Sequence, residues 1–109
     1  MAKVINMVAT ECQPEVEEAF NKWYDEVHIP MLFKYKGMAK VTRYKIMNKT
    51  GEFPSYLAVY EFENLPEYQA YEKSPEIIAA RAEMKETWKE GGWEIKWRVQ
   101  YEETKTWEK

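Results

Sequence analysis

The stretch WEIKWRVQYE (Trp93–Glu102) decides the fold, because apolar and polar side chains alternate along it without a break. An alternation of period two is typical of a β-strand with one buried face. The polar face is expected to meet water or a partner, which suits a strand at the edge of a sheet. The alternation predicts that the buried face carries Trp93, Ile95, Trp97, Val99 and Tyr101.

Three segments upstream also have strand character. Lys3–Ala9 (KVINMVA) and Ser55–Phe62 (SYLAVYEF) are mostly apolar on both faces, as expected of central strands that are covered on both sides. Met38–Asn48 (MAKVTRYKIMN) combines β-branched and aromatic residues with three charges, which favours an edge strand. Residues 49–54 would join this edge strand to Ser55–Phe62 as a hairpin.

Two helical regions separate these strands. The first begins at Pro14, where carboxylates follow in the first turn, and Pro30 is predicted to end it because proline offers no N–H. The second begins at Pro66, restarts at Pro75 after Ser74, and stops at Gly91-Gly92. The apolar face of the first helix recurs at helical spacing through Val16, Phe20, Trp23 and Val27.

The order of elements is βαββαβ, which predicts one domain over residues 1–109 with an α+β, ferredoxin-like sandwich fold. Its four-stranded antiparallel sheet would have the order 4-1-3-2, with both helices on one face. The chain also holds five Trp, eight Tyr, four Phe and six Met. This is more large apolar surface than one small core hides, so we expect both a ligand cavity and a homodimer interface.

Composition excludes several classes of function. The net charge of -3 gives no electrostatic reason to bind nucleic acid or an anionic membrane. The sequence contains no apolar run of the ~18 residues that span a bilayer and no signal peptide, so we expect a cytoplasmic protein. A single cysteine, Cys12, and a single histidine argue against a disulfide and a metal site. No Gly-rich phosphate loop is present, and we expect no cofactor, with heme bound through His28 as the alternative that stays open.

The single histidine, His28, is the strongest candidate for chemistry. Tyr24 and Asp25 precede it by four and three residues, so all three side chains can share one helix face. The helix dipole favours the charged imidazole and burial favours the neutral one, which suits proton transfer near neutral pH. We expect His28 to act as general acid or base, Tyr24 to polarise a carbonyl oxygen and Asp25 to orient the ring. The alternative is that His28 only caps its helix.

Trp23–Leu32 (WYDEVHIPML) resembles the W-Y-x-x-x-H-x-P-L pattern of EthD-like proteins in the dimeric α/β-barrel superfamily, with Met31 in place of the commoner leucine. The resemblance extends along nearly the whole chain. It implies that His28 and Tyr24 match the family's motif residues, and that His28 lies at a pocket between helices and sheet. From motif adjacency and strand position, we expect an apolar pocket lined by Trp23, Phe33, Tyr44, Tyr60 and Trp97.

Three functions remain open at this point. The first is a cofactor-free enzyme that binds a hydrophobic, carbonyl-bearing small molecule and transfers a proton, leading to isomerisation, cyclisation or elimination. The second is a non-catalytic binding protein for a fatty-acid-like or aromatic ligand. The third is a cofactor-free monooxygenase, a reaction found in the superfamily. Arg43 and Arg81 could hold a substrate carboxylate or form ordinary ion pairs with glutamates.

Overall fold

The computed structural model describes residues 2–109 and contains four strands and two helical regions. The strands are β1 (Val4–Cys12), β2 (Met38–Lys45), β3 (Tyr56–Phe62) and β4 (Trp93–Glu102). The helical segments between β1 and β2 are η1 (Pro14–Val16), α1 (Glu17–Trp23), η2 (Tyr24–His28) and α2 (Ile29–Leu32). Those between β3 and β4 are α3 (Leu65–Tyr71) and α4 (Pro75–Thr87).

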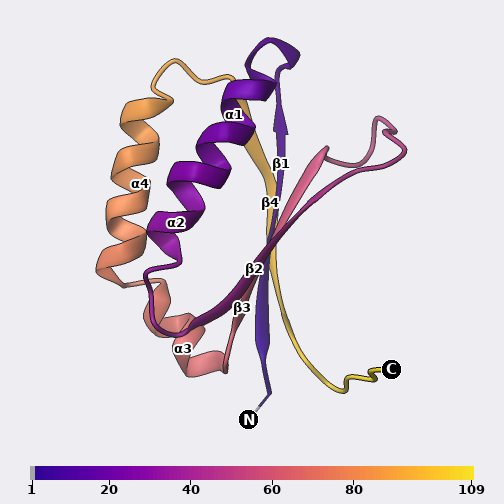
Figure 1. The fold of residues 1–109 in the computed structure, drawn as a ribbon, viewed down its shortest axis with the longest axis vertical. Helices are drawn as coiled ribbons and strands as arrows, with labels where there is room; N and C mark the ends of the chain where they lie inside the picture. The colour runs from indigo at the N-terminus through magenta and orange to yellow at the C-terminus, as the bar shows by residue number, and fades with distance from the viewer. Residues whose placement is uncertain (1) are drawn as a thin grey trace.

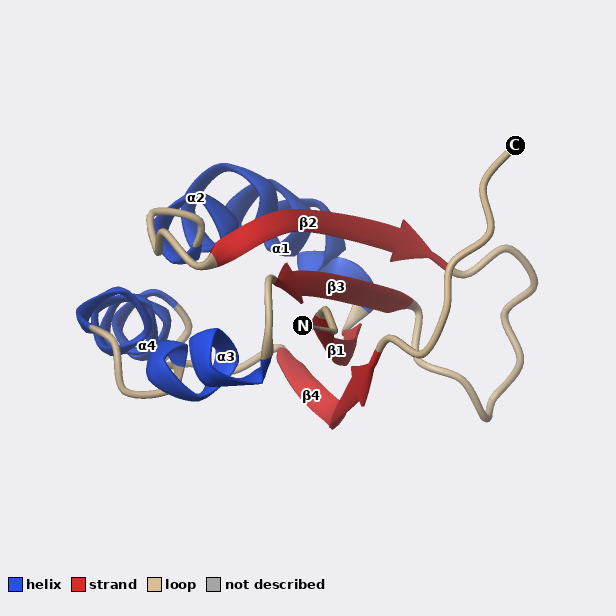
Figure 2. Cartoon of the chain, turned by 90° about the horizontal axis from the view of Figure 1, so that it is seen from below, coloured by secondary structure: helices blue, strands red, loops and turns tan. Residues whose placement is uncertain are grey.

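The four strands form one antiparallel sheet in the order β2-β3-β1-β4. The predicted ferredoxin-like arrangement and its strand order are therefore confirmed. Figure 1 shows the helices on one side of the sheet and none on the other, and Figure 2 shows α1 and α2 beside β2, with α3 and α4 on the side of β4. One face of the sheet is thus covered by helices, and we call the other the open face.

The first helix does not end at Pro30, so that prediction is wrong. α1 continues through the π-helical turn η2 into α2, and Pro30 is the second residue of α2. The wider turn is visible in the hydrogen bond from the Ile29 N–H to the carbonyl of Tyr24, five residues earlier. A π turn interrupts the regular series of i→i−4 hydrogen bonds. A proline just after it, which has no N–H to donate, is therefore tolerated without ending the helix.

Strand β4 contains a register shift that the sequence pattern concealed. Ala9 of β1 lies opposite Trp97, whereas Thr10, the next residue, lies opposite Ile95. The extra residue on β4, Lys96, is a β-bulge, and it reverses which side chains face the helices. The prediction of one continuous buried face along β4 is therefore wrong.

The bulge divides the apolar residues of β4 between the two faces of the sheet. Trp93 and Ile95 pack against the helix-covered core, whereas Trp97 is 42% exposed on the open face. Beyond the bulge, Arg98 and Gln100 lie on the helix-covered side of the sheet, where they line a pocket and remain exposed to solvent. On the open face, Met7 lies opposite Val59 on one side and Val99 on the other, and Ile5 is the next residue of β1 on the same face; all four are half-buried. Polar side chains of β4 therefore lie on the helix-covered face, and apolar side chains form a surface on the open face.

The core under the helices is built mainly from aromatic rings. Phe20 is fully buried and lies within 5.4 Å of the rings of Tyr24 and Trp93, measured between ring centroids. Phe62, also fully buried, packs against Tyr68 and Tyr71 at 5.2 and 4.8 Å. These two clusters lie at opposite ends of the sheet and fix the helices above it. The space between them is not filled completely, and the candidate site lies there.

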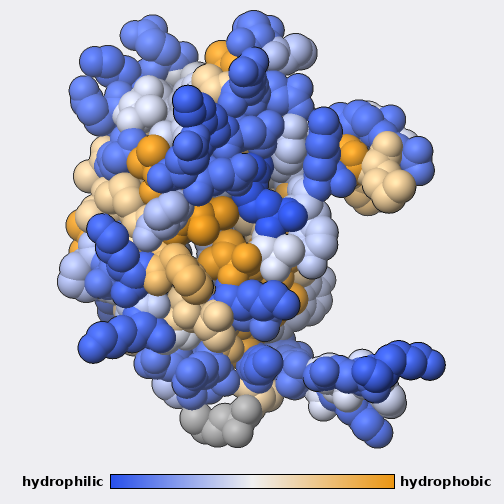
Figure 3. Space-filling view, viewed as in Figure 1, coloured by the Kyte–Doolittle hydropathy of each residue, from blue (hydrophilic) through white to orange (hydrophobic). Residues whose placement is uncertain are grey.

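A second hollow lies on the open face, where the hairpin loop between β2 and β3 projects from the sheet (Figure 1). This groove has a volume of about 240 Å³ and is almost entirely apolar. Figure 3 shows hydrophobic surface on the projecting loop. The principal residues of the groove are Ala9, Tyr44, Phe53, Leu57 and Trp97.

Among residues 2–109, no helix has both the length and the apolar character needed to cross a membrane.

Candidate functional site

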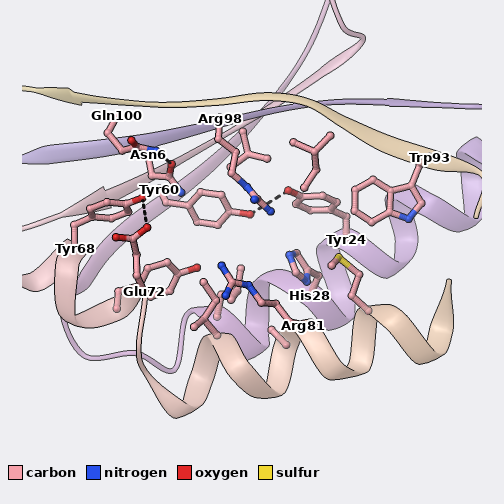
Figure 4. A pocket seen from close by; sticks show the side chains of 17 residues that line it. Asn6, Tyr24, His28, Tyr60, Tyr68, Glu72, Arg81, Trp93, Arg98 and Gln100 are labelled. Atoms are coloured by element: carbon pink, nitrogen blue, oxygen red, sulfur yellow. Dashed lines mark hydrogen bonds between the residues drawn. The ribbon is translucent and has the colours of Figure 1, made fainter. Parts of the chain in front are cut away.

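A pocket of about 160 Å³ lies between the sheet and the helices (Figure 4). Its walls come from four parts of the fold: the turn η2 with helix α2, helix α3 with the residues that follow it, helix α4, and the helix-facing side of β1, β3 and β4. The apolar part of the lining includes Val8, Leu32, Ile77, Met84, Trp93 and Ile95. The polar part includes Asn6, Tyr24, His28, Tyr60, Tyr68, Tyr71, Glu72, Arg81, Arg98 and Gln100.

His28 closes the π turn and lines this pocket. Its ring stacks on Trp23 at a centroid distance of 4.7 Å and meets the edge of Tyr24 at 5.1 Å. The Nδ1 atom is buried and has no hydrogen-bond partner among the described residues. Burial lowers the pKa of His28 to about 4, although the carboxylate of Glu83 opposes this effect. The imidazole is therefore neutral at pH 7 and able to accept a proton.

Tyr24 and Tyr60 form a buried pair of hydroxyl groups beside His28. Their oxygens are 3.1 Å apart, so one hydroxyl donates to the other. Burial raises the pKa of Tyr24 and raises the pKa of Tyr60 well above its ordinary value. Both groups keep their protons at pH 7. Because only one proton is used within the pair, the other can be donated to an oxygen of a bound molecule.

Asp25 contacts Arg43 and does not reach the His28 ring. Its carboxylate is 57% exposed and accepts from Arg43 Nη1 at 2.9 Å. The Arg43 guanidinium in turn lies 4.4 Å from the ring centroid of Tyr24 and 5.0 Å from that of Tyr56. This cation–π contact stabilises the position of the Tyr24 ring from the side away from the pocket. The structure therefore places Asp25 behind Tyr24, through Arg43, and not beside the histidine.

The other sequence-predicted lining residues are divided between several places. Tyr60 lines the pocket together with Tyr24 and His28. Trp23 lies behind the His28 ring, and its indole N–H donates to Glu83 at 2.9 Å. Phe33 is 49% exposed beyond the end of α2. Two further residues, Tyr44 and Trp97, line the groove on the open face, on the opposite side of the sheet.

Several polar groups of the pocket were not predicted from the sequence. Gln100 donates to the side chain of Asn6 at 2.9 Å, and Tyr68 donates to Glu72 at 3.1 Å. Arg98 lies on the same side of β4 as Gln100, which the bulge turns toward the helices. The buried Asn6 in an otherwise apolar central strand was the one sequence signal that pointed to polar groups here.

The described residues contain no group of three or more His, Cys, Asp or Glu side chains that could hold a metal ion. The polar atoms of the pocket are instead hydroxyl, imidazole, amide and guanidinium groups, with one carboxylate. Such a set donates and accepts hydrogen bonds and moves protons. It suits an organic molecule that carries oxygen atoms.

Comparison with solved structures shows the same fold in proteins of low sequence identity. An EthD (ethyl tert-butyl ether D) family protein from Bacillus halodurans C-125 is 16% identical, with a TM-score of 0.69, over 95% of this chain and 100% of that chain. A dimeric protein of unknown function and ferredoxin-like fold from Bacteroides fragilis NCTC 9343 is 23% identical, with a TM-score of 0.62, over 92% and 95%. A Shewanella loihica PV-4 protein with a provisional assignment as a monooxygenase is 13% identical, with a TM-score of 0.63, over 97% and 99%.

These likenesses confirm the ferredoxin-like fold and the expected resemblance of that fold to an EthD family protein. No curated protein matches the chain. One family model matches residues 3–100, which is nearly the entire length of the chain. The protein therefore belongs to the family described as a domain of unknown function, DUF4286.

Proposed function

We propose that the protein is a cofactor-free enzyme that transfers a proton on a small, carbonyl-bearing molecule bound between the sheet and α4. The observation that carries this proposal is that a neutral His28 lines the pocket, with a buried Nδ1 that has no partner among the described residues. Leaving a buried polar atom unpaired costs free energy, so such an atom requires an explanation, and a catalytic role of the ring supplies one. Burial and an unusual pKa in a cleft are features of proton-transfer sites.

The residues present support one mechanism in particular. A ketone oxygen accepts a hydrogen bond from the free hydroxyl proton of the Tyr24–Tyr60 pair. His28 removes a proton from the carbon beside the carbonyl, so the C–H bond breaks, an N–H bond forms and the electron pair moves to the oxygen. The resulting enolate is stabilised by the tyrosine hydrogen bond. Return of the proton to another position isomerises the molecule, and a positioned base of this kind contributes typically ~10²–10⁴-fold in rate.

The test uses acetophenone, whose methyl protons exchange with solvent through an enolate. In D₂O, the protein is expected to accelerate loss of the methyl proton signal in NMR spectra. His28→Gln keeps a polar side chain but removes the base, so exchange should fall to the buffer rate. Glu26→Gln, at an exposed position outside the pocket, serves as the control.

Two outcomes would overturn this proposal. Exchange that persists in His28→Gln would remove His28 from the reaction. Binding of acetophenone by the wild-type protein without any exchange above the buffer rate would instead favour a non-catalytic binding protein. Tyr24→Phe is expected to slow exchange less than His28→Gln, because Tyr60 keeps a hydroxyl beside the same space.

A monooxygenase is the second candidate, favoured by one contact. The indole of Trp23 stacks directly on His28, so an oxidisable ring adjoins the base. The Shewanella loihica neighbour with its provisional assignment supports the same reaction class. Oxygen uptake in the presence of anthrone, with anthraquinone and water as products, would replace the proton-transfer proposal if it exceeded the rate without protein.

We also propose that a second copy of the chain covers the open face and makes a homodimer. The side chains of Ile5, Met7, Val59 and Val99 form a contiguous apolar surface there, of a kind that marks protein interfaces. The Bacteroides fragilis neighbour is described as dimeric. Sedimentation velocity should give twice the mass of one chain, and a monomer at micromolar concentration would contradict this assembly.

A further inference from the structure

Two arginines enter the pocket from opposite walls. Figure 4 shows Arg81 reaching in from helix α4 and Arg98 from the sheet, with both side chains directed toward the space beside Tyr24 and His28. Neither guanidinium forms an ion pair within residues 2–109. By contrast, Arg43 outside the pocket is paired with Asp25. The two pocket arginines therefore keep their full capacity to bind an anion.

The balance of charge in the pocket is opposite to that of the whole chain. The chain has 19 acidic and 16 basic residues, for a net charge of -3. The pocket lining contains two cations, Arg81 and Arg98, and one carboxylate, Glu72, which also accepts a hydrogen bond from Tyr68. His28 is neutral at pH 7. The lining therefore carries one net positive charge, which matches a ligand with one negative charge.

We propose that Arg81 and Arg98 bind a carboxylate group of the substrate, so that the pocket takes a carbonyl-bearing aromatic or cyclic carboxylic acid. Guanidinium groups match the planar carboxylate through paired hydrogen bonds. The apolar body would lie against Ile77 and Ile95, with its carbonyl toward the tyrosine pair. This inference rests on the proposed function, because it names the substrate class for the same site.

A carboxylate is favoured over a phosphate for two reasons. A carboxylate carries one negative charge at pH 7 and balances the single net positive charge of the lining, whereas a phosphate monoester carries nearly two. The planar carboxylate also pairs with a guanidinium through two parallel hydrogen bonds, in the pocket of about 160 Å³. Planar recognition by two guanidinium groups therefore fits the space and the charge together.

Substrate binding would also prepare the base. Burial is the main cause that lowers the pKa of His28, and the positive charge of Arg98 adds a smaller effect in the same direction. A carboxylate held by Arg98 offsets this charge and raises the pKa of His28 above about 4, while burial still keeps it below its ordinary value. A base is most effective when its pKa lies near the working pH. The two arginines thus select the substrate, and Arg98 also makes His28 a stronger base when the substrate is bound.

The experiment compares 3-acetylbenzoate with 3-acetylbenzamide, two ketones that differ in charge but little in shape. Isothermal titration calorimetry on the wild-type protein is expected to give at least about tenfold tighter binding of the acid, as for a charge-assisted hydrogen bond. Arg98→Met and Arg81→Met should each reduce this preference, and the double variant should abolish it. Lys85→Met removes the same charge from an exposed position on α4 and should keep the preference.

Three results would overturn the proposal: equal binding of acid and amide by the wild-type protein, a preference that survives in the double variant, or binding of inorganic phosphate at these arginines without binding of the acid. None of these removes His28-dependent exchange of acetophenone, so the proposed function could stand while the carboxylate inference fails. Conversely, His28→Gln should lose exchange and keep the preference for the acid. Circular dichroism of each variant verifies that it is folded.

Discussion

Burial of the neutral His28 ring predicts that the stability of the protein depends on pH through this one side chain. The pKa of His28 is about 4 in the folded protein, compared with its ordinary value of 6.5. Between these two values the unfolded chain binds a proton that the folded protein does not. Stability from this group is therefore complete above about pH 6.5 and is lost as the pH falls toward 4.

The magnitude follows from the difference between the two pKa values. One pKa unit corresponds to ~1.4 kcal/mol. Lowering the pH from 7 to 4 should therefore reduce the free energy of unfolding by roughly 2 to 3 kcal/mol through the titration of His28. Other groups titrate over the same range, so the wild-type protein must be compared with a variant that lacks only this titration. His28→Gln provides that comparison, because glutamine cannot take up a proton.

The assay is urea unfolding of both proteins at pH 7, 6, 5 and 4, followed by circular dichroism. The free energy of unfolding of the wild-type protein, minus that of His28→Gln, should fall by roughly 2 to 3 kcal/mol from pH 7 to pH 4. Titration of all remaining groups cancels in this difference. A difference that is constant with pH would refute the burial of the ring, and one that rises toward low pH would show that the folded protein favours the charged imidazole.

Three further predictions concern other parts of the molecule. Gly92→Ala should lower the free energy of unfolding in urea by at least ~1 kcal/mol, because Gly92 has a φ of +114° and a Cβ there would lie 3.2 Å from Val16 Cγ2. Unchanged stability would contradict this prediction. Val99→Asp should convert the proposed dimer to a folded monomer in sedimentation velocity, whereas a persistent dimer would place the interface elsewhere. Asp25→Asn should lower stability by less than ~1 kcal/mol, because its carboxylate is exposed, and should leave acetophenone exchange within twofold; loss of exchange would restore the role predicted from the sequence.

The sequence predicted the fold because periodicity and breaker residues determined each element separately. Central and edge strands were distinguished by the polarity of their faces, and that distinction was sufficient for the strand order. The end of the first helix was misplaced because a π turn has no simple periodic signature. Only the hydrogen bond from Ile29 to Tyr24 reveals that the turn is widened before Pro30.

The site was harder to predict than the fold, and the bulge at Lys96 explains why. A strict alternation along β4 assigns Trp97 to the buried face and Arg98 to the wet face. One extra residue exchanges these assignments, so that Arg98 enters the pocket and Trp97 leaves it. The local partners Tyr24 and His28 share one helical turn, and their adjacency could be read from spacing.

Both proposals for the pocket require a His28 ring that is neutral and largely buried in the free protein. Because the chain has one histidine, NMR of the imidazole nuclei during a pH titration gives a single unambiguous curve. The curve should give a pKa of about 4 for the free protein, and a higher value after saturation with 3-acetylbenzoate. A pKa near 6.5 that does not change with this compound would contradict both the burial of the ring and the binding of a carboxylate beside it.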